Sequence, residues 1–169
     1  DAVALLDRYR SREDVTIITA PGPFNFSALC NRGVEAAHGE VVVLLNNDVE
    51  PTSPDWLREL VVQASREHVG AVGALLRYPN GRLQHVGIVL GVNGTAEHIF
   101  RGYPGDWSGI NGRCGSVQEM SAVTGACLAV RRDRYLAVGG CDESFAVSQN
   151  DVDLCLRLAA RGWLTLWTP

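Results

Sequence analysis

The chain has 169 residues, of which 46% are hydrophobic and 20% charged, and this composition predicts one globular domain rather than a disordered segment. Its net charge of -4 argues against a nucleic-acid-binding protein, because such proteins neutralise phosphates with an excess of basic residues. The five cysteines include no C-x-x-C pair, which argues against a zinc knuckle or a disulfide framework and favours reduced thiols in the cytoplasm.

Neither a membrane span nor a signal peptide is predicted, because the apolar runs reach about six residues where a span needs roughly 18. We therefore expect a cytoplasmic protein, at most peripheral at the inner face of the membrane. The sequence begins at Asp1 within a helical pattern and stops at Pro169 after an apolar run. We expect residues 1–169 to form a single partial domain, truncated at both ends.

Helical and strand patterns alternate through the first half of the chain. The β-branched run Val15–Thr19 predicts a short strand, and the continuous apolar run Val41–Leu45 predicts a strand buried on both faces. Predicted helices span residues 2–10, 26–37 and about 53–68; Asn25 or Ser27 caps the second, Ser53 caps the third, and Gly70 closes the third.

The same alternation continues in the second half. Strands are predicted over 71–76, 83–90, 126–130 and 164–167, with helices ending at Val138 and spanning 150–161. Residues 91–115 hold seven glycines and predict a long functional or mobile loop. This order predicts an α/β fold whose mixed, mostly parallel sheet is flanked by helices.

Two amides and a carboxylate, Asn46, Asn47 and Asp48, follow the apolar run directly. In open α/β sheets, ligands bind at the carboxyl ends of strands, and a hard cation such as Mg²⁺ or Mn²⁺ often binds through one carboxylate and substrate phosphates. Asn and Asp are also ordinary turn residues. The cluster alone therefore fits either a simple turn or a diphosphate site.

A second acidic cluster, Ser148 to Asp153, opens the last predicted helix. Ser148 and Asp151 are spaced like a capping box, and acidic residues suit the first turn of any helix. Alternatively, Asp151 is a general base that takes a proton from a substrate hydroxyl. Spacing alone leaves both interpretations open.

Three sequence blocks carry a more specific signal than either acidic cluster. They read FNFSALCNRGVEAAHGEVVVLLNNDVEPTSPDWLREL, LQHVGIVLGVNGTAEHIF and VTGACLAVRRDRYLAVGGCDESFAVSQNDVDLCLRLAARGW. In this order, and over nearly the whole chain, they resemble family 2 glycosyltransferases with the GT-A fold, of the rhamnosyltransferase-like type found in bacterial polysaccharide assembly.

The resemblance implies a role for each acidic cluster. Asp48 would bind a divalent metal, Mg²⁺ or Mn²⁺, at the family's D-x-D position, with Asn46 and Asn47 on the nucleotide-sugar donor. Asp151 would be the base at the second residue of the family's E-D pair. Asn150 stands in place of the Glu, and Asn46 in place of the first Asp; each change keeps a hydrogen-bonding group and removes a charge.

Weaker candidates accompany these residues. Asn31 and Arg32 resemble a donor-diphosphate segment, although exposed Asn-Arg on a helix is often solvated surface. Candidates on the acceptor side are Gly125, Ala126, Asn150, His85 and His98. Strand packing explains the two small residues equally well, and a lone histidine is usually structural.

The implied reaction is an inverting, metal-dependent transfer of a sugar from a nucleotide-sugar donor to a hydroxyl of a glycan or lipid-linked acceptor. The first nucleotide-binding strand and a C-terminal His segment of the family are not found, so the fragment is expected to be weakly active or inactive. The missing strand predicts an exposed sheet edge and a homodimer through it. The alternatives are a non-catalytic carbohydrate- or nucleotide-binding module and an inverting glycoside hydrolase.

Overall fold

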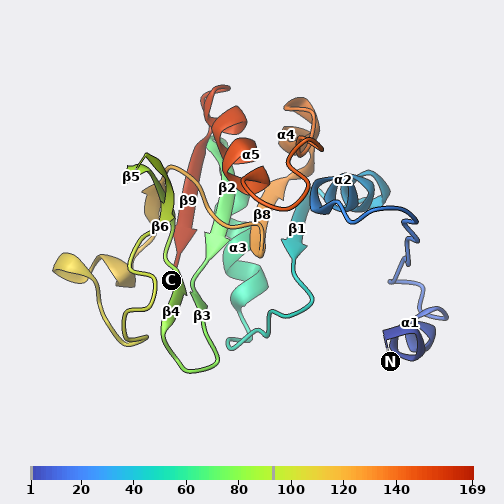
Figure 1. Cartoon of the computed structure of the whole chain (residues 1–169), viewed down its shortest axis with the longest axis horizontal. Coiled ribbons are helices and arrows are strands. Elements are labelled where there is room, and N and C mark those ends of the chain that lie inside the picture. Colours follow the sequence, from blue (N-terminus) through green and yellow to red (C-terminus); the bar gives the residue numbers. More distant parts are fainter. Residues whose placement is uncertain (1, 93) are drawn as a thin grey trace.

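A computed structural model describes residues 2–92 and 94–169 as an α/β fold with helices on both faces of a central sheet (Figure 1). The helices are α1 (Ala2–Tyr9), α2 (Phe26–Ala36), α3 (Trp56–Ala64), α4 (Arg132–Ala137) and α5 (Asn150–Ala159), with a 3-10 helix at Ile110–Gly115. The strands are β1 (Val41–Leu45), β2 (Val69–Ala74), β3 (Leu76–Arg77), β4 (Leu83–His85), β5 (Ile88–Val92), β6 (Thr95–His98), β7 (Gln118–Met120), β8 (Cys127–Arg131) and β9 (Leu164–Thr168). None of the helices in these ranges is long and apolar enough to cross a membrane.

Five strands form the main sheet in the order β1-β8-β2-β9-β7. β8 is antiparallel to both β1 and β2, β7 is antiparallel to β9, and β2 and β9 pair in parallel. The prediction of a mixed sheet is confirmed, but the prediction of a mostly parallel one is wrong. The β1-α3-β2 crossover does leave β1 and β2 running in one direction, but β8 lies between them and makes both contacts antiparallel.

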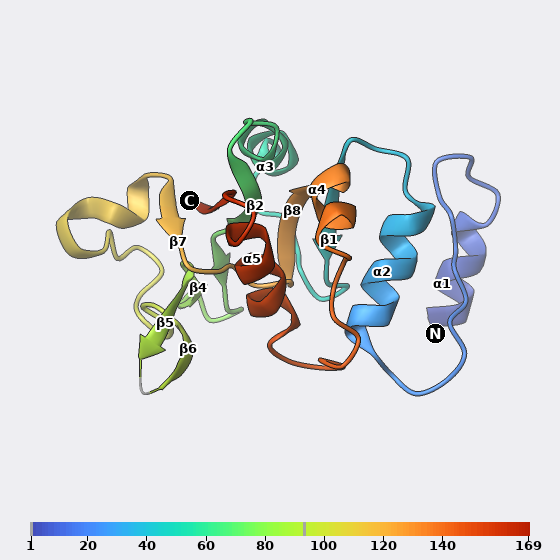
Figure 2. The same cartoon turned by 90° about the horizontal axis from the view of Figure 1, so that it is seen from above.

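The helices divide between the two faces of the sheet (Figure 2). α3 packs on one face through the buried Leu60 and Ala64. α5 packs on the other through Leu154 and Leu158, in a cluster that also contains the fully buried Trp167 of β9. Burying each large apolar side chain contributes about 1.5–3 kcal/mol, so the two clusters hold the loops at the strand ends in a fixed arrangement.

β1 begins and ends where the sequence predicts, yet it is not buried on both faces. It lies at the edge of the sheet, where β8 is its one strand partner among the described residues, and Leu45 is 43% exposed. An apolar run indicates contact with a core, but it does not distinguish a central strand from an edge strand packed between helices.

The predicted strand at Val15–Thr19 is absent; these residues form irregular chain between α1 and α2. α1 stands apart from the sheet at the far end of this segment (Figure 1). β-branched residues favour a strand only where a partner edge lies within reach, and this segment has none in the described structure.

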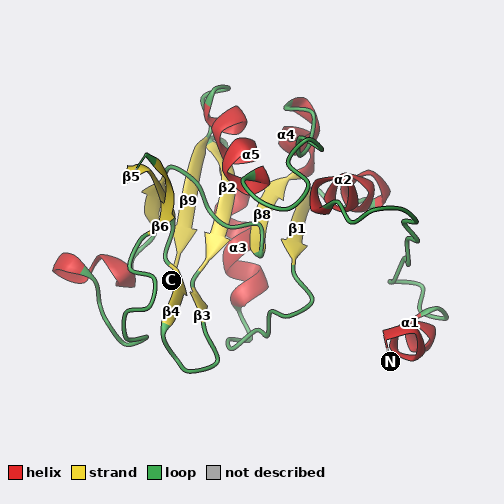
Figure 3. Ribbon diagram, in the orientation of Figure 1, coloured by secondary structure: helices red, strands yellow, loops and turns green. Residues whose placement is uncertain are grey.

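The predicted strand at Leu83–Leu90 is two strands. Gly87, with a φ of 102°, separates β4 from β5, because that backbone conformation interrupts a strand and suits glycine. β5 forms a hairpin with β6, and β6 lies inside the stretch predicted as a loop. Two small sheets, β3–β4 and β5–β6, thus lie on the β9 and β7 side of the main sheet (Figure 3).

Helix boundaries follow local signals in one case and depart from them in another. Asn25 caps α2 as predicted, since its side chain accepts a hydrogen bond from the Ala28 N–H at 3.0 Å. α3 is shorter than predicted: its N-cap is Asp55 rather than Ser53, and it ends before Gly70, which lies within β2. Two residues lie outside the described structure: Asp1 at the start of the chain and Asn93 in the glycine-rich stretch.

Candidate active site

The polar cluster after β1 lies at the carboxyl end of that strand. The Asn46 N–H donates to the Ala126 carbonyl at 2.9 Å, and the Asn46 carbonyl accepts from the Val49 N–H at 3.3 Å. Asn47 and Asp48 are exposed in the turn that results. The turn interpretation is therefore structurally correct, and it leaves the Asp48 carboxylate accessible to a ligand.

Asp151 lies in the first turn of α5, half-buried. Its Oδ2 accepts a hydrogen bond from the Gly125 N–H and its Oδ1 one from the Val152 N–H, both at 2.9 Å. The capping box that the spacing of Ser148 and Asp151 allows is not formed, because the N-cap is Gln149 and no side chain caps the helix there. Gln149 has a φ of 67°, an uncommon conformation for a residue with a side chain and one that tends to occur at functional sites.

Gly125 and Ala126 connect the two acidic centres. The Ala126 carbonyl accepts a hydrogen bond from the N–H of Asn46, the first residue of the β1 turn. The neighbouring Gly125 N–H donates to Oδ2 of Asp151. The structure thus brings the Asp48 turn and the Asp151 carboxylate to the same end of the sheet, on either side of one short segment. A Cβ on Gly125 would lie 3.5 Å from that of Asp151, so this segment lies directly against the carboxylate.

Asn150 is 4% exposed and serves the local structure. Its Oδ1 accepts from the Asp151 N–H at 2.8 Å, and its Nδ2 donates to the Phe145 carbonyl at 3.3 Å. The Phe145 carbonyl also accepts from the Ser27 hydroxyl of α2 at 2.7 Å. Asn150 therefore ties the start of α5 to the loop that precedes it and, through that loop, to α2.

Asn31 of α2 uses its whole amide within the protein. Its Oδ1 accepts from the Tyr135 hydroxyl at 2.7 Å and the Cys141 N–H at 2.8 Å; its Nδ2 donates to the Cys141 carbonyl at 2.9 Å and to Glu143 Oε1 at 3.0 Å. An amide has two donor hydrogens and two acceptor lone pairs. A donor contact from Asn31 would require one of these bonds to break, whereas the neighbouring Arg32 is exposed beside a pocket of about 190 Å³.

His85 and His98 lie together behind the Gly125 segment. His85 is fully buried on β4, its Nδ1 is 3.0 Å from Nδ1 of His98, and its Nε2 accepts from the Thr124 N–H at 3.4 Å. Burial lowers the pKa of His85 to about 3. Burial is also the main cause that lowers the pKa of His98, while the nearby Asp151 acts in the opposite direction.

This histidine pair predicts a loss of stability in mild acid. An unfolded histidine binds a proton near pH 6.5, while folded His85 stays neutral down to about pH 3. Between these values the unfolded state binds more protons, so the free energy of unfolding falls as the pH falls. For His85 the slope is about 0.7 kcal/mol per pH unit at pH 6.5 and approaches about 1.4 kcal/mol per pH unit near pH 5. Urea unfolding between about pH 6.5 and pH 5, above the range where carboxylates titrate, measures this slope. A flat profile there would contradict it.

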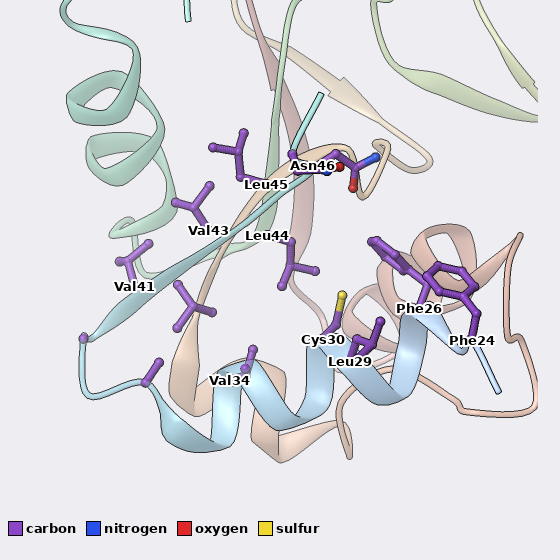
Figure 4. A pocket seen from close by; sticks show the side chains of 15 residues that line it. Phe24, Phe26, Leu29, Cys30, Val34, Val41, Val43, Leu44, Leu45 and Asn46 are labelled. Atoms are coloured by element: carbon purple, nitrogen blue, oxygen red, sulfur yellow. The ribbon is translucent and has the colours of Figure 1, made fainter. Parts of the chain in front are cut away.

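Two pockets open on either side of the end of β1. One, of about 700 Å³, lies between β1 and α2 and reaches Asn46 and Asn47 (Figure 4). Phe24 and Phe26 lie beside it, and Leu44 points toward α2 within it. The other, of about 660 Å³, is bordered by Val49, Trp56 and Thr168 among others. Both volumes are in the range of small-molecule sites.

The donor set at the β1 turn fits an oxygen-preferring cation bound together with a substrate. Within residues 2–92 and 94–169, no three His, Cys, Asp or Glu side chains are grouped so that they could hold a metal ion. The exposed Asp48 supplies one carboxylate at this turn, and diphosphate oxygens would supply most of the remaining ligands, as is common for Mg²⁺.

Three residues at this site were not singled out from the sequence: Phe26, Thr124 and Gln149. A Cβ on Gly125 would meet the Phe26 ring at 3.4 Å, so Phe26 forms part of the wall beside Asp151. A positive φ at Gln149 leaves no sequence signal, because Gln has no preference for it. Thr124 directly precedes Gly125 and Ala126, which the sequence indicates as candidate site residues, and this position could have identified Thr124 as a further candidate.

Comparison with known proteins gives consistent matches. The model of the family Glycosyl transferase family 2 matches residues 1–100. Among curated proteins, the O-antigen biosynthesis protein RfbC of Myxococcus xanthus is 42% identical over 163 residues, which are 96% of this chain and 13% of that protein. The N-acetylglucosaminyl-diphospho-decaprenol L-rhamnosyltransferase of Mycobacterium tuberculosis is 32% identical over 136 residues, 76% of this chain and 44% of that protein. An uncharacterised Sinorhizobium fredii protein, y4gI, is 47% identical, over 92% of this chain and 17% of its own length.

Solved structures show the same fold at low sequence identity. The mannosyltransferase PcManGT from Pyrobaculum calidifontis, in complex with GDP-Man and Mn²⁺, has a TM-score of 0.65 at 18% identity, covering 99% of this chain and 41% of that one. GalNAc-T7 with UDP, GalNAc and Mn²⁺ has a TM-score of 0.71 at 15% identity, covering 98% and 33%. The chain thus spans less than half the length of each of these proteins, and its fold is that of GT-A glycosyltransferases.

Proposed function

Because the chain belongs to glycosyl transferase family 2, we propose that it forms the catalytic part of an enzyme that transfers a sugar, with inversion, from a nucleotide-sugar donor to a hydroxyl of an acceptor. The observation that carries this proposal is the connection of the Asp48 turn to Asp151 through Ala126 and Gly125. An inverting transfer needs charge stabilisation on the donor diphosphate and a base on the opposite side of the sugar, and these two groups supply them.

Asp151 is the proposed base. Its two carboxylate oxygens are oriented by the Gly125 and Val152 N–H groups, and each oxygen keeps a further lone pair for the proton of an acceptor hydroxyl. The half-buried position lets a hydroxyl reach the carboxylate while the protein excludes part of the solvent. Such a positioned base contributes about 10²- to 10⁴-fold to the rate.

The β1 turn is the proposed donor site. Asp48 would hold Mg²⁺ or Mn²⁺, and Asn46 and Asn47 would hydrogen-bond the donor, with Arg32 further along α2. The Asn31 amide is engaged within the protein instead. The metal, when bound, neutralises the charge that develops on the leaving diphosphate. Support comes from the two structural neighbours, each determined with Mn²⁺ and a nucleotide or nucleotide sugar.

Replacing Asp48 with Asn is expected to weaken Mn²⁺-dependent binding of a nucleoside diphosphate by at least about 10-fold, or about 1.4 kcal/mol, because the one carboxylate of the site is removed. Titration calorimetry with UDP, GDP and dTDP, with and without Mn²⁺, measures the effect. The matched control is Glu50→Gln, which removes an exposed carboxylate two residues away and should leave binding unchanged. Equal affinity for Asp48→Asn and the unchanged chain would contradict the donor-site assignment.

The acceptor is proposed to be a glycan or a lipid-linked sugar in bacterial cell-surface polysaccharide synthesis. The similarity to an O-antigen biosynthesis protein and to a rhamnosyltransferase whose name includes a diphospho-decaprenol lipid supports this class. A screen of nucleotide sugars against the intact gene product, which detects released nucleoside diphosphate, tests it. Gly125, Ala126 and Asn150 would border the acceptor next to Asp151.

A non-catalytic binding module is the second candidate, because Asn46 and Asn150 stand where the family resemblance implies acids. Such a module would bind the nucleotide yet show no dependence on Asp151.

The sheet edge at β1 also supports the predicted homodimer, since an unpaired strand edge can pair with a second copy. Light scattering should then give twice the monomer mass, and a monomer at high concentration would contradict pairing through this edge.

A further inference from the structure

We propose that His85 and His98 are positioning residues: they form a neutral pair, locked in defined tautomers, that fixes the Thr124–Gly125 turn and thereby the base Asp151. This inference rests on the proposed function only in naming Asp151 as the base. The pair itself is defined by hydrogen bonds that do not depend on catalysis. Its two rings meet edge to face, with centroids 4.9 Å apart.

The hydrogen bonds determine where each proton lies. A backbone N–H can only donate, so the Thr124 N–H at 3.4 Å requires an unprotonated Nε2 on His85. Neutral His85 then carries its proton on Nδ1 and donates it to Nδ1 of His98, 3.0 Å away. His98 must therefore carry its own proton on Nε2.

The surroundings keep the pair neutral. His85 is enclosed in the core and faces one titratable group, His98. His98 faces Arg101, which disfavours its charged form, and Asp151 and Glu97, which favour it; burial outweighs both acids. A proton on Nδ1 of His98 would meet the Nδ1–H of His85, so protonation would break the bond between the rings.

The pair acts on the proposed base through two consecutive backbone N–H groups. The Thr124 N–H points to His85, and the next one, from Gly125, points to Asp151 Oδ2 at 2.9 Å. The turn is thus held between a buried imidazole and the carboxylate. Without His85 as acceptor, the Thr124 N–H loses its partner, and the donor that orients Asp151 is no longer fixed.

The pair also adds a side-chain link between parts of the fold that the backbone already holds together, since Ile88 of β5 forms a β-bridge with Ala122. His85 belongs to the β3–β4 sheet and His98 to the β5–β6 sheet, and these two sheets share no strand. His85 contacts Thr124, shortly before β8, and His98 contacts His85, so the pair connects both small sheets to the segment beside the site. The region between 83 and 98 therefore has a structural reason to influence the geometry of Asp151.

The first test measures the tautomers directly in the unsubstituted chain. Long-range ¹H–¹⁵N spectra at neutral pH should show His85 protonated on Nδ1 and His98 on Nε2, with neither ring charged. The exposed His38 and His68 serve as internal references for the resonances of histidines outside the pair. A charged His85, or one protonated on Nε2, would overturn the proposal whether or not the chain transfers sugar.

The second test uses substitutions of the half-buried His98, where folding is easier to preserve. His98→Leu removes the acceptor, while His98→Asn retains an amide oxygen near the position of Nδ1. We expect His98→Leu to shift the Thr124 and Gly125 amide resonances and to lower kcat by about 10-fold with little change in the KM for the donor, in line with typical effects of supporting residues. His98→Asn should recover most of both, and His68→Asn should change neither.

The outcomes separate this inference from the proposed function. If the intact enzyme shows no transfer, the proposed function fails while the tautomer measurement still decides the pair. If transfer occurs and His98→Leu matches the unsubstituted enzyme in kcat and in the Gly125 resonance, the positioning role is wrong. Equal losses in His98→Leu and His98→Asn would also overturn it, because the hydrogen bond would then not matter.

Discussion

We expect an Asp151→Asn variant of the intact enzyme to transfer sugar about 10²- to 10⁴-fold more slowly than the unsubstituted enzyme. The amide keeps one oxygen that can accept the Gly125 N–H, while the Val152 N–H loses its side-chain acceptor. We expect the fold to be retained, because Val152 lies in the first turn of α5, where N–H groups have no partner within the helix. What the variant loses is the ability to take a proton from the acceptor. Initial rates of nucleoside diphosphate release measure the loss, and the affinity for the donor should stay unchanged.

The matched control for this variant is Asp153→Asn on the same helix. The Asp153 carboxylate pairs with Arg157 one turn further along, at 2.6 Å, and is therefore engaged within the helix surface. We expect its replacement to alter the transfer rate less than about threefold, since an i,i+4 pair contributes only about 0.3–0.5 kcal/mol. Similar losses for both variants, or no loss for Asp151→Asn, would contradict the assignment of the base and favour a binding module.

An Asn31→Ala variant should lower the free energy of unfolding by about 2–4 kcal/mol, because several partly buried hydrogen bonds lose a partner at once. Asn31 joins α2 to Tyr135 of α4 and to the Cys141 backbone. The Tyr135 hydroxyl and the Cys141 N–H would be left without this acceptor in the interior. Urea unfolding monitored by tryptophan fluorescence measures the change.

This variant also distinguishes the structural role of Asn31 from the donor contact predicted from the sequence. The control is Arg32→Ala, an exposed neighbour on the same helix, which should change stability by less than about 0.5 kcal/mol. If Arg32 contacts the donor diphosphate, its variant should instead weaken nucleotide binding. A stable Asn31→Ala protein with weakened nucleotide binding would reverse this assignment.

The elements that the sequence predicts well are those determined by local signals. The bounds of β1 follow from its apolar run, and the start of α2 follows from the Asn25 cap. The parallel or antiparallel pairing of the strands could not be predicted from such local signals. β8 pairs with β1 and β2 although more than fifty residues separate it from either strand, and no local pattern shows where a late strand inserts.

The same limit applies to the candidate site. Residue types made Asp48, Asp151 and the Gly125-Ala126 pair candidates, and the resemblance to family 2 glycosyltransferases implied the roles of the two acids. Their mutual arrangement depends on two long-range hydrogen bonds. The bond from Gly125 to Asp151 spans 26 residues, and the bond from Asn46 to Ala126 spans about 80. The spacing also allowed Asp151 to be read as part of a helix cap. In the structure no side chain caps α5, and Asp151 accepts a long-range hydrogen bond from Gly125.

The histidine pair shows why lone residues resist interpretation. Each histidine appeared separately as a structural or acceptor-side candidate, and the sequence gave no reason to pair residues on different strands. The hairpin of β5 with β6 brings His98 to His85, and β6 lies in a stretch that reads as a loop. Gly91 and Gly94 interrupt the alternating pattern that would have indicated strands on either side of them.

The central claim, that the Asp48 turn and Asp151 border one donor and acceptor site, is tested most directly by paramagnetic NMR. Mn²⁺ added with a saturating nucleoside diphosphate should broaden the amide resonances of Asn46 to Asp48 and of Gly125 and Ala126, and leave those of α1 sharp. The broadening should disappear in Asp48→Asn. Nucleotide-dependent broadening centred on another part of the chain, or confined to the β1 turn without reaching Gly125, would contradict a shared site.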